Sequence, residues 1–260
     1  MKADAVPDAR GAAIKVQDVS GEFILEGTTD PAVQDFVMAN HPAFIARDVK
    51  DYLRLQRARL NAVYRPLTML EALTRGTWDP QQWYWKETLA TATVLTQFPV
   101  HPACQTYYSM VPIRFGNYIA KYRLKLMSRF SVSSLHFLKT LATQADAFRI
   151  LLAETLRASS LTFEFQVQLR TNAQSMPIED ASATWPEAES PYRTVARLML
   201  PQQELNSSAW KLGDELSFSV WNALAAHRPL GGMNRVRKAA YDVSAAWRRA
   251  RQDSKVGGSC

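Results

Sequence analysis

The feature that most constrains the fold is the segment 161–170 (LTFEFQVQLR), in which apolar and polar side chains alternate. Successive side chains of a β-strand point to opposite faces, so this period of two is typical of a strand with one buried face. We therefore expect a strand here, with Phe163, Phe165 and Val167 directed toward the core.

Further strands are predicted where β-branched and aromatic residues concentrate, at 10–16, 105–111, 117–126, 192–200 and 214–220. Helices are predicted at 30–40, 48–60, 67–73, 147–158 and 234–251. Asp48 is expected to cap the second of these helices by accepting a hydrogen bond from a free backbone N–H. Strands fill the middle of the chain and helices lie toward its ends, without regular alternation. The predicted fold class is α+β, an antiparallel sheet or barrel with flanking helices.

The length of the chain fits one large domain. Its 260 residues are 47% apolar and 21% charged, which is the composition of an ordinary globular protein. We expect a single domain over 1–255 and a flexible tail over 256–260. No segment approaches the roughly 20 apolar residues of a membrane span, and residues 1–10 lack the apolar core of a secretory signal. The two cysteines, Cys104 and Cys260, do not make a disulfide framework, so a reducing cytoplasm is expected.

Positive charge gathers at the C-terminal end. Residues 227–260 hold eight Lys or Arg against two Asp, which accounts for six of the seven net positive charges. Such a basic helix fits a nucleic acid, an anionic lipid or a buried anionic ligand, or it simply presents a solvated face.

Two stripes divide the predicted helix at 234–251. At about 100° per residue, one stripe is apolar and consists of Val236, Ala240, Val243 and Trp247. The other, rotated by about 90°, consists of Arg237, Tyr241, Ser244 and Arg248. A guanidinium and a phenol at positions i and i+4 are neighbours on a helix, and the positive charge favours the phenolate form. Because a phenolate is a hard anionic ligand suited to ferric iron, this stripe is a candidate cofactor-binding surface.

Residues 227–248 resemble the proximal helix of small haem proteins of the catalase superfamily. In that family the helix carries Arg-x-x-x-Tyr, then a hydroxyl residue and a second Arg, and Tyr241, Ser244 and Arg248 fit those positions. Val243 stands where the family has Asp. Other blocks that resemble the family, in the family's order, are 8–16, 39–48, 161–168 and 177–186.

The resemblance implies a catalase-type antiparallel β-barrel that binds haem b through Tyr241 as the axial iron ligand. Further cofactor-binding residues implied in the same way are Arg237, Arg248, Ser244, Phe44 and Gly11. The implied activity is a catalase or peroxidase reaction on hydrogen peroxide or an organic hydroperoxide. A homo-oligomer is one expectation, and a nucleic-acid partner is not expected.

The distal side departs from the family pattern. The family's distal His lies in a segment upstream of the first strand that this chain does not have, so we expect either a truncated copy or a natural short form. The family's distal Asn aligns with Ala39, and Asn40 follows it. Cleavage of a peroxide requires a proton to be removed and returned. Asn40 and His41 are therefore the catalytic candidates, although a His in such a position is more often a packing residue than a substitute base.

Three functions remain open at this stage. The first is a haem-dependent peroxide enzyme, with activity impaired by the missing distal His. The second is a haem-binding protein without turnover, and the third is a lipid-binding barrel whose basic helix docks a partner.

Overall fold

The structure is a computed structural model that describes residues 3–24, 32–62, 64–65 and 67–256, with the backbone alone at 94–95 and 248–256. Its strands are β1 (Gly11–Val16), β2 (Gln34–Ala39), β3 (Tyr107–Tyr108), β4 (Ile113–Phe115), β5 (Tyr118–Leu126), β6 (Leu161–Leu169) and β7 (Arg193–Leu200). Its α-helices are α1 (Val49–Asn61), α2 (Thr68–Thr74), α3 (Trp85–Thr96), α4 (Ser134–Thr143), α5 (Ala147–Ala158), α6 (Ser207–Glu215) and α7 (Gly231–Val256). Short 3-10 helices are η1 (Pro80–Gln82), η2 (Pro102–Cys104) and η3 (Ala225–His227).

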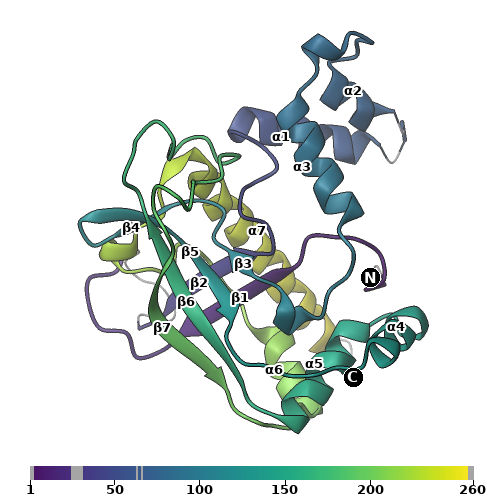
Figure 1. Ribbon diagram of the computed structural model, residues 1–260, viewed down its shortest axis with the longest axis vertical. Coiled ribbons are helices and arrows are strands. Elements are labelled where there is room, and N and C mark those ends of the chain that lie inside the picture. Colours follow the sequence, from purple (N-terminus) through teal and green to yellow (C-terminus); the bar gives the residue numbers. More distant parts are fainter. Residues whose placement is uncertain (1–2, 25–31, 63, 66, 257–260) are drawn as a thin grey trace.

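The strands form one antiparallel sheet in the order β1-β2-β3-β5-β6-β7, with β4 paired to β5. The sheet curls into a half-barrel (Figure 1), and no pairing joins β1 to β7 in the part of the chain that the structure describes. The predicted α+β class and the single antiparallel sheet are confirmed. The barrel is open along one side rather than closed.

The concave face of the sheet carries the main core. Phe163 and Val167 of β6 are buried there, and Phe165 packs against the same cluster, so the predicted inward face of β6 is confirmed. Leu156 of α5 joins this cluster and covers one end of the face. Burial of such large apolar side chains contributes roughly 1.5–3 kcal/mol each.

The convex face is polar but also covered, by the segment 171–192. Gln168 of β6 is buried and donates to the carbonyl oxygens of Trp185 and Ser190, at 3.2 and 2.9 Å. Beside it on β5, the Lys121 ammonium donates to the Ala183 carbonyl oxygen at 2.8 Å and lies 5.2 Å from the Trp185 ring. These buried polar groups are matched with partners, which fixes the covering segment on the sheet.

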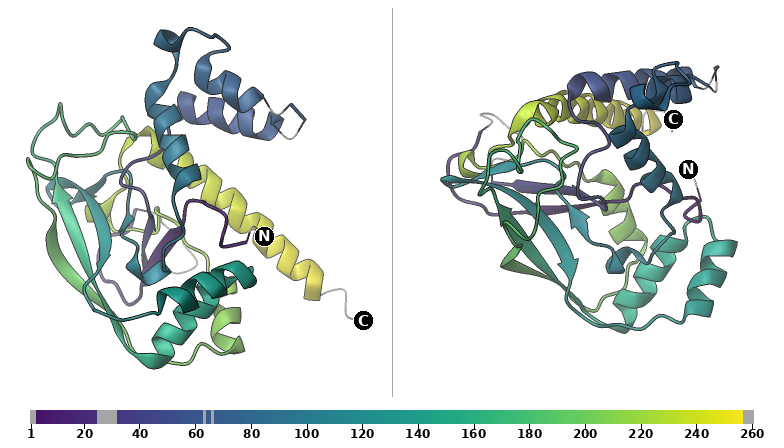
Figure 2. Two further views of the ribbon diagram at one scale, coloured as in Figure 1. Left: turned by 45° about the vertical axis from the view of Figure 1, so that its right-hand side comes forward. Right: turned by 45° about the horizontal axis from the view of Figure 1, so that its top comes forward.

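Helices α1 to α3 form a lobe at one end of the molecule, beyond the sheet (Figures 1 and 2). The Asp48 carboxylate accepts from the Asp51 N–H at 3.0 Å, which confirms the predicted N-cap of α1. Leu55 of α1 and Leu73 of α2 are buried with Ala46 in a small core of their own. Within the described residues, no helix is both long enough and apolar enough to cross a membrane.

The helix predicted at 30–40 is wrong. Its described part contains β2, which pairs with β1 on one side and with β3 on the other. Gln34, Asp35 and Met38 are all buried, so both faces of this strand are covered and the period of two is hidden. Residues 30–31 lie outside the described residues.

The strand predicted at 214–220 is also wrong, because Asp214 belongs to α6 and no strand follows within 216–220. Asn206, whose side chain accepts from the Ala209 N–H, is the cap that starts this helix. The strand predicted at 105–111 is shortened to β3. Helices α3 and α4 were not predicted. Of the tail predicted at 256–260, Val256 belongs to α7, and residues 257–260 lie outside the described residues.

A pH-dependent stability is expected from Lys121, which is only 2% exposed. Burial lowers its pKa from 10.5 to about 8, with the charge of Asp180 opposing the shift. The unfolded chain therefore binds more protons between pH 8 and pH 10.5, so the free energy of unfolding rises with pH in this window, by about 3 kcal/mol. The check is urea unfolding of the wild type and Lys121→Met from pH 7 to pH 11. As pH rises, the free energy of unfolding of the wild type should increase relative to that of Lys121→Met. For Lys125→Met, at an exposed position of the same strand, the free energy of unfolding should change with pH as it does in the wild type. A difference in unfolding free energy between the wild type and Lys121→Met that does not change with pH would contradict the prediction.

Candidate functional site

The start of α7 is held tightly against the body of the protein. Gly231 has a φ of +83°, and an added Cβ would lie 2.9 Å from the Ile178 carbonyl oxygen, so only glycine fits there. The predicted helix began at Asn234, but α7 begins at Gly231, so Asn234 lies buried within its first turn. Its side-chain amide donates to the carbonyl oxygens of Pro112 and Leu230, at 3.0 and 2.8 Å. These contacts set the direction in which α7 leaves the sheet.

Arg237 and Tyr241 form the polar pair that the spacing on α7 predicts. The guanidinium Nη2 donates to the Tyr241 phenol oxygen at 2.9 Å, and Nη1 donates to the Asn234 side-chain oxygen at 3.4 Å. Both side chains are half-buried. Asn234 thus orients the guanidinium, and the guanidinium places a permanent positive charge directly on the Tyr241 oxygen.

Aromatic side chains of the sheet lie below this pair. Tyr122 of β5 makes ring contacts with Phe36 of β2 and Phe165 of β6, each with centroids 5.3 Å apart. Burial raises the pKa of Tyr122 to about 12, and its hydroxyl donates to the Val37 carbonyl oxygen at 3.3 Å. Tyr122 therefore stays a neutral donor, and Tyr241 is the phenol of the two that the guanidinium contacts directly.

The cavity between Arg237 and the sheet is small. It has a volume of about 10 Å³, and its lining includes Phe36, Tyr122, Asn234 and Arg237. That is the space of about one water molecule. A large ligand therefore reaches this pair only from the half-exposed side of Tyr241, not through the sheet.

The rest of the predicted stripe lies further along α7. Ser244 is exposed, and the side chain of Arg248 lies outside the described residues. On the neighbouring apolar stripe Val243 and Trp247 are 71% and 56% exposed, so this part of the helix extends past the protein core. The structure thus brings together Arg237 and Tyr241, but it does not place Ser244 against them.

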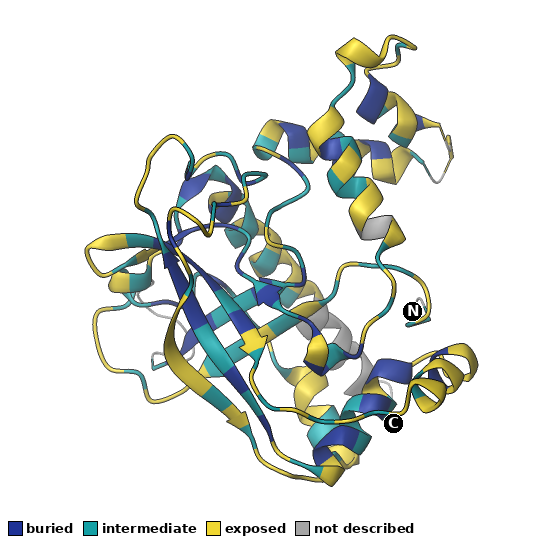
Figure 3. Cartoon of the chain, viewed as in Figure 1, coloured by how far each residue is buried: buried dark blue, intermediate teal, exposed yellow. Residues whose placement is uncertain are grey.

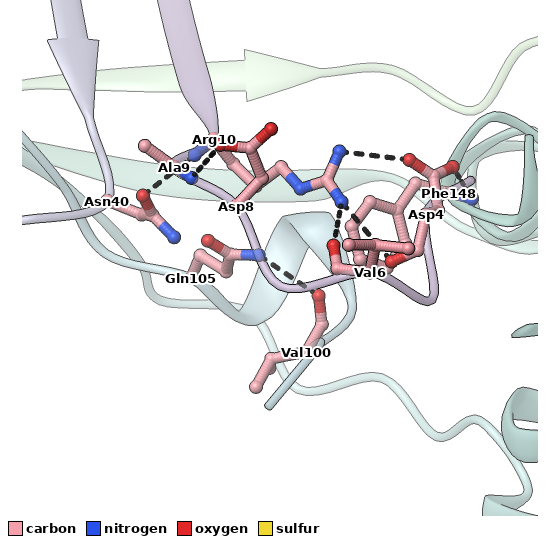
Figure 4. A network of polar contacts seen from close by, with 9 residues as sticks. All are labelled: Asp4, Val6, Asp8, Ala9, Arg10, Asn40, Val100, Gln105 and Phe148. Atoms are coloured by element: carbon pink, nitrogen blue, oxygen red, sulfur yellow. Dashed lines mark hydrogen bonds and ion pairs between the residues drawn. The ribbon is translucent and has the colours of Figure 1, made fainter. Parts of the chain in front are cut away.

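Asn40 is placed by the backbone of Arg10, the residue directly before β1 (Figure 4). Its side-chain oxygen accepts from the Arg10 N–H at 2.8 Å, and its own N–H donates to the Arg10 carbonyl oxygen at 2.9 Å. Its amide nitrogen donates to the Gln97 side-chain oxygen at 3.2 Å. Both ends of the Asn40 side chain are therefore occupied by the protein itself.

His41 and Phe44 follow in the loop that leads to α1. Burial lowers the pKa of His41, and its Nε2 atom is buried without a hydrogen-bond partner. Phe44 packs on Tyr52 at a centroid distance of 5.3 Å and joins the cluster of Val111, Ala181 and Met233, the last of which lies on α7. Phe44 thus packs against an apolar cluster that includes a residue of the helix of Tyr241.

Gly11 is exposed at the start of β1, where it pairs with Ala39. An added Cβ would lie 3.5 Å from the Met38 carbonyl oxygen, an ordinary contact. Its backbone therefore does not require glycine, and its assigned place in a cofactor pocket stays a prediction.

Sequence reasoning did not single out Tyr122 or Asn234 as site residues. Tyr122 lay within a predicted strand, but only the register of β5 with β6, which pairs it with Val167, places it on the concave face. The i, i+3 spacing of Asn234 and Arg237 on one helix is the signal that could have indicated this contact.

No protein-family model matches the chain, and no curated protein matches it by sequence. Solved structures do match. They include a bacterial catalase (TM-score 0.68, 18% identity), a fungal catalase (0.66, 16%) and catalase A from Saccharomyces cerevisiae (0.65, 16%). Each match covers 95% of this chain and 48–50% of the catalase. The chain therefore has a catalase-like fold, and it spans about half the length of the catalases it matches.

The donor chemistry on α7 fits the proximal side of a haem. A phenol oxygen with a guanidinium at 2.9 Å is an oxygen donor beside a permanent positive charge. The described residues contain no group of three or more His, Cys, Asp or Glu that could hold a metal ion. In the loop after β2, both ends of the Asn40 side chain are occupied, whereas the Nε2 atom of His41 is buried without a hydrogen-bond partner.

Proposed function

We propose that this protein binds haem b through Tyr241 and acts on hydrogen peroxide or an organic hydroperoxide. The observation that carries the proposal is the Arg237–Tyr241 contact at 2.9 Å on the half-exposed face of α7, within a catalase-like fold. Tyr is a haem iron ligand known from catalase. We place the protein in a reducing compartment such as the cytoplasm, where Cys104, a free and exposed thiol within the described residues, stays reduced.

Each residue has a stated task in this proposal. Tyr241 would hold the haem iron through its oxygen, Arg237 would keep a positive charge beside that oxygen, and Asn234 keeps the guanidinium in place. Phe44, which packs against the cluster that includes Met233 of α7, would give an apolar contact near the helix. When bound, haem supplies the redox chemistry of peroxide breakdown.

The candidate groups for the proton transfers of that reaction, Asn40 and His41, are poorly arranged for the task. Asn40 uses its side chain to hold Arg10 and Gln97, so it does not orient a substrate without breaking those bonds. His41 is a neutral imidazole at neutral pH because burial lowers its pKa, but no hydrogen bond joins it to α7 in the described part of the chain. These observations favour a second candidate function, haem binding with little or no turnover.

Replacing Tyr241 with Phe should remove the iron ligand. We expect the haem content of the purified protein to fall at least about tenfold, because an axial ligand is a main source of haem affinity. Absorbance in the Soret region, normalised to protein, measures this. Tyr118→Phe is the matched control, since Tyr118 is an exposed phenol on β5. If Tyr241→Phe keeps a full complement of haem with an unchanged spectrum, the ligand assignment is wrong.

Replacing Arg237 with Leu should keep the helix, because both residues are good helix formers, but remove the charge from the Tyr241 oxygen. The iron–phenolate bond should then become labile at mildly acid pH. A pH titration of the haem spectrum tests this, with Arg235→Leu as the control that removes an exposed charge from the same helix. Identical titrations for Arg237→Leu and Arg235→Leu would contradict the role given to Arg237.

Peroxide turnover should be slow, by about 10²–10⁴-fold relative to a catalase with a distal base, because general acid–base assistance has that magnitude. We expect His41→Gln to leave the residual rate nearly unchanged, with His136→Gln, an exposed His, as the control. Oxygen release from peroxide measures both rates. Full turnover by the wild type, or loss of most of the residual rate in His41→Gln, would contradict this account of the distal side.

A further inference from the structure

The turn between α1 and α2 exposes large apolar side chains at the far end of the helical lobe. Leu60, in the last turn of α1, is 70% exposed, Tyr64 is 88% exposed, and Leu67, at the N-cap of α2, is 66% exposed. Two backbone hydrogen bonds position the described residues of this turn: the N–H groups of Tyr64 and Arg65 both donate to the Asn61 carbonyl oxygen. These three side chains therefore lie around one turn.

The exposure does not result from poor packing of the two helices. On their inner side Leu55, Ala58 and Leu73 are buried, and the Thr68 hydroxyl donates to the Ala58 carbonyl oxygen at 2.9 Å. The hairpin thus satisfies its own core and still presents apolar side chains to solvent. Figure 3 shows the outer surface of this lobe as mostly exposed.

The charge around the turn has one sign. Residues 52–70 contain four Arg and no Asp or Glu. Arg54 turns inward, where it lies over the Tyr84 ring at 3.5 Å and pairs with Asp51 at 3.1 Å. The other three, Arg57, Arg59 and Arg65, are exposed. We call the set Arg57, Arg59, Leu60, Tyr64, Arg65 and Leu67 the hairpin tip.

We propose that the hairpin tip docks this protein on the surface of an anionic lipid bilayer. Leucine and tyrosine side chains enter the headgroup region, where a phenol keeps its hydroxyl in contact with water. Guanidinium groups beside them bind lipid phosphates and are attracted by the negative surface charge. Exposed apolar groups ringed by basic groups are complementary to such a surface in both respects.

An RNA is less well matched by the same residues. Recognition of single-stranded RNA uses aromatic or guanidinium planes on which bases stack, and two of the three apolar side chains here are leucines. The inference is independent of the haem proposal, because no residue of the hairpin tip belongs to α7 or to the segment of Asn40 and His41.

The test is flotation of the purified full chain with vesicles of phosphatidylcholine alone or of phosphatidylcholine with about one third phosphatidylglycerol. We expect binding to the anionic vesicles only, weakening as salt is raised because the charges at the tip become screened. The variant Arg57→Gln, Arg59→Gln, Arg65→Gln should lower partitioning about a hundredfold, since each basic residue near an anionic surface contributes about fivefold. The variant Leu60→Ser, Tyr64→Ser should lower it at least about tenfold without loss of thermal stability.

Two controls separate the tip from general charge and general hydrophobicity. Arg129→Gln, Arg193→Gln, Arg197→Gln removes the same number of exposed charges elsewhere, and Leu135→Ser, Leu212→Ser removes exposed leucines from α4 and α6. Both should bind anionic vesicles nearly as the wild type does. The proposal is overturned if the wild type does not bind anionic vesicles, if the tip variants bind as well as the wild type, if the control variants lose binding equally, or if the tip variants lose binding to a single-stranded RNA but not to vesicles.

Discussion

One buried carboxylate connects the sheet to the helix of the candidate site. The side chain of Asp35 on β2 is fully buried, yet it pairs with Lys15 of β1 at 2.9 Å and accepts from the Ser219 N–H and the Asn222 side-chain amide, at 2.9 and 2.8 Å. A buried charge is tolerated only with such partners, and breaking a pair of this kind costs about 3–5 kcal/mol. Because Ser219 and Asn222 lie just before α7, this one charge holds two strands and the approach to α7 in a single arrangement.

A series of further contacts then determines where the Tyr241 oxygen lies. The Gln34 side-chain oxygen accepts from the Leu224 N–H at 3.0 Å, and Gly231 allows the chain to pass close to Ile178. The Trp221 indole then donates to the Asn234 carbonyl oxygen at 2.8 Å, and Asn234 in turn holds Arg237. The position of Tyr241 therefore depends on contacts made by residues far from it in the sequence, and not on the helix alone.

This dependence explains how far the sequence could be used for prediction. The period of two in 161–170 and the Asp48 cap are local signals, and both were confirmed. The helix predicted at 30–40 failed because β2 is covered on both faces, so a paired central strand showed no alternation. In the site, the i, i+4 spacing predicted the Arg237–Tyr241 contact, because such a contact is built within one helix. The orientation of Tyr122 and the engagement of Asn40 could not be predicted, since both depend on pairing between distant strands.

The two sides of the candidate site differ in how fully their hydrogen bonds are satisfied. On α7 the Arg237 guanidinium has a partner at each of its two terminal nitrogens, so the phenol that it contacts is held in place before any ligand arrives. Near β2 the relation is reversed, because Asn40 is already engaged with Arg10 and Gln97 while the Nε2 atom of His41 is buried without a partner. In the proposed function, haem binding would use the first side and proton transfer the second. The two would then depend on separate groups, so haem binding can persist where peroxide turnover is weak.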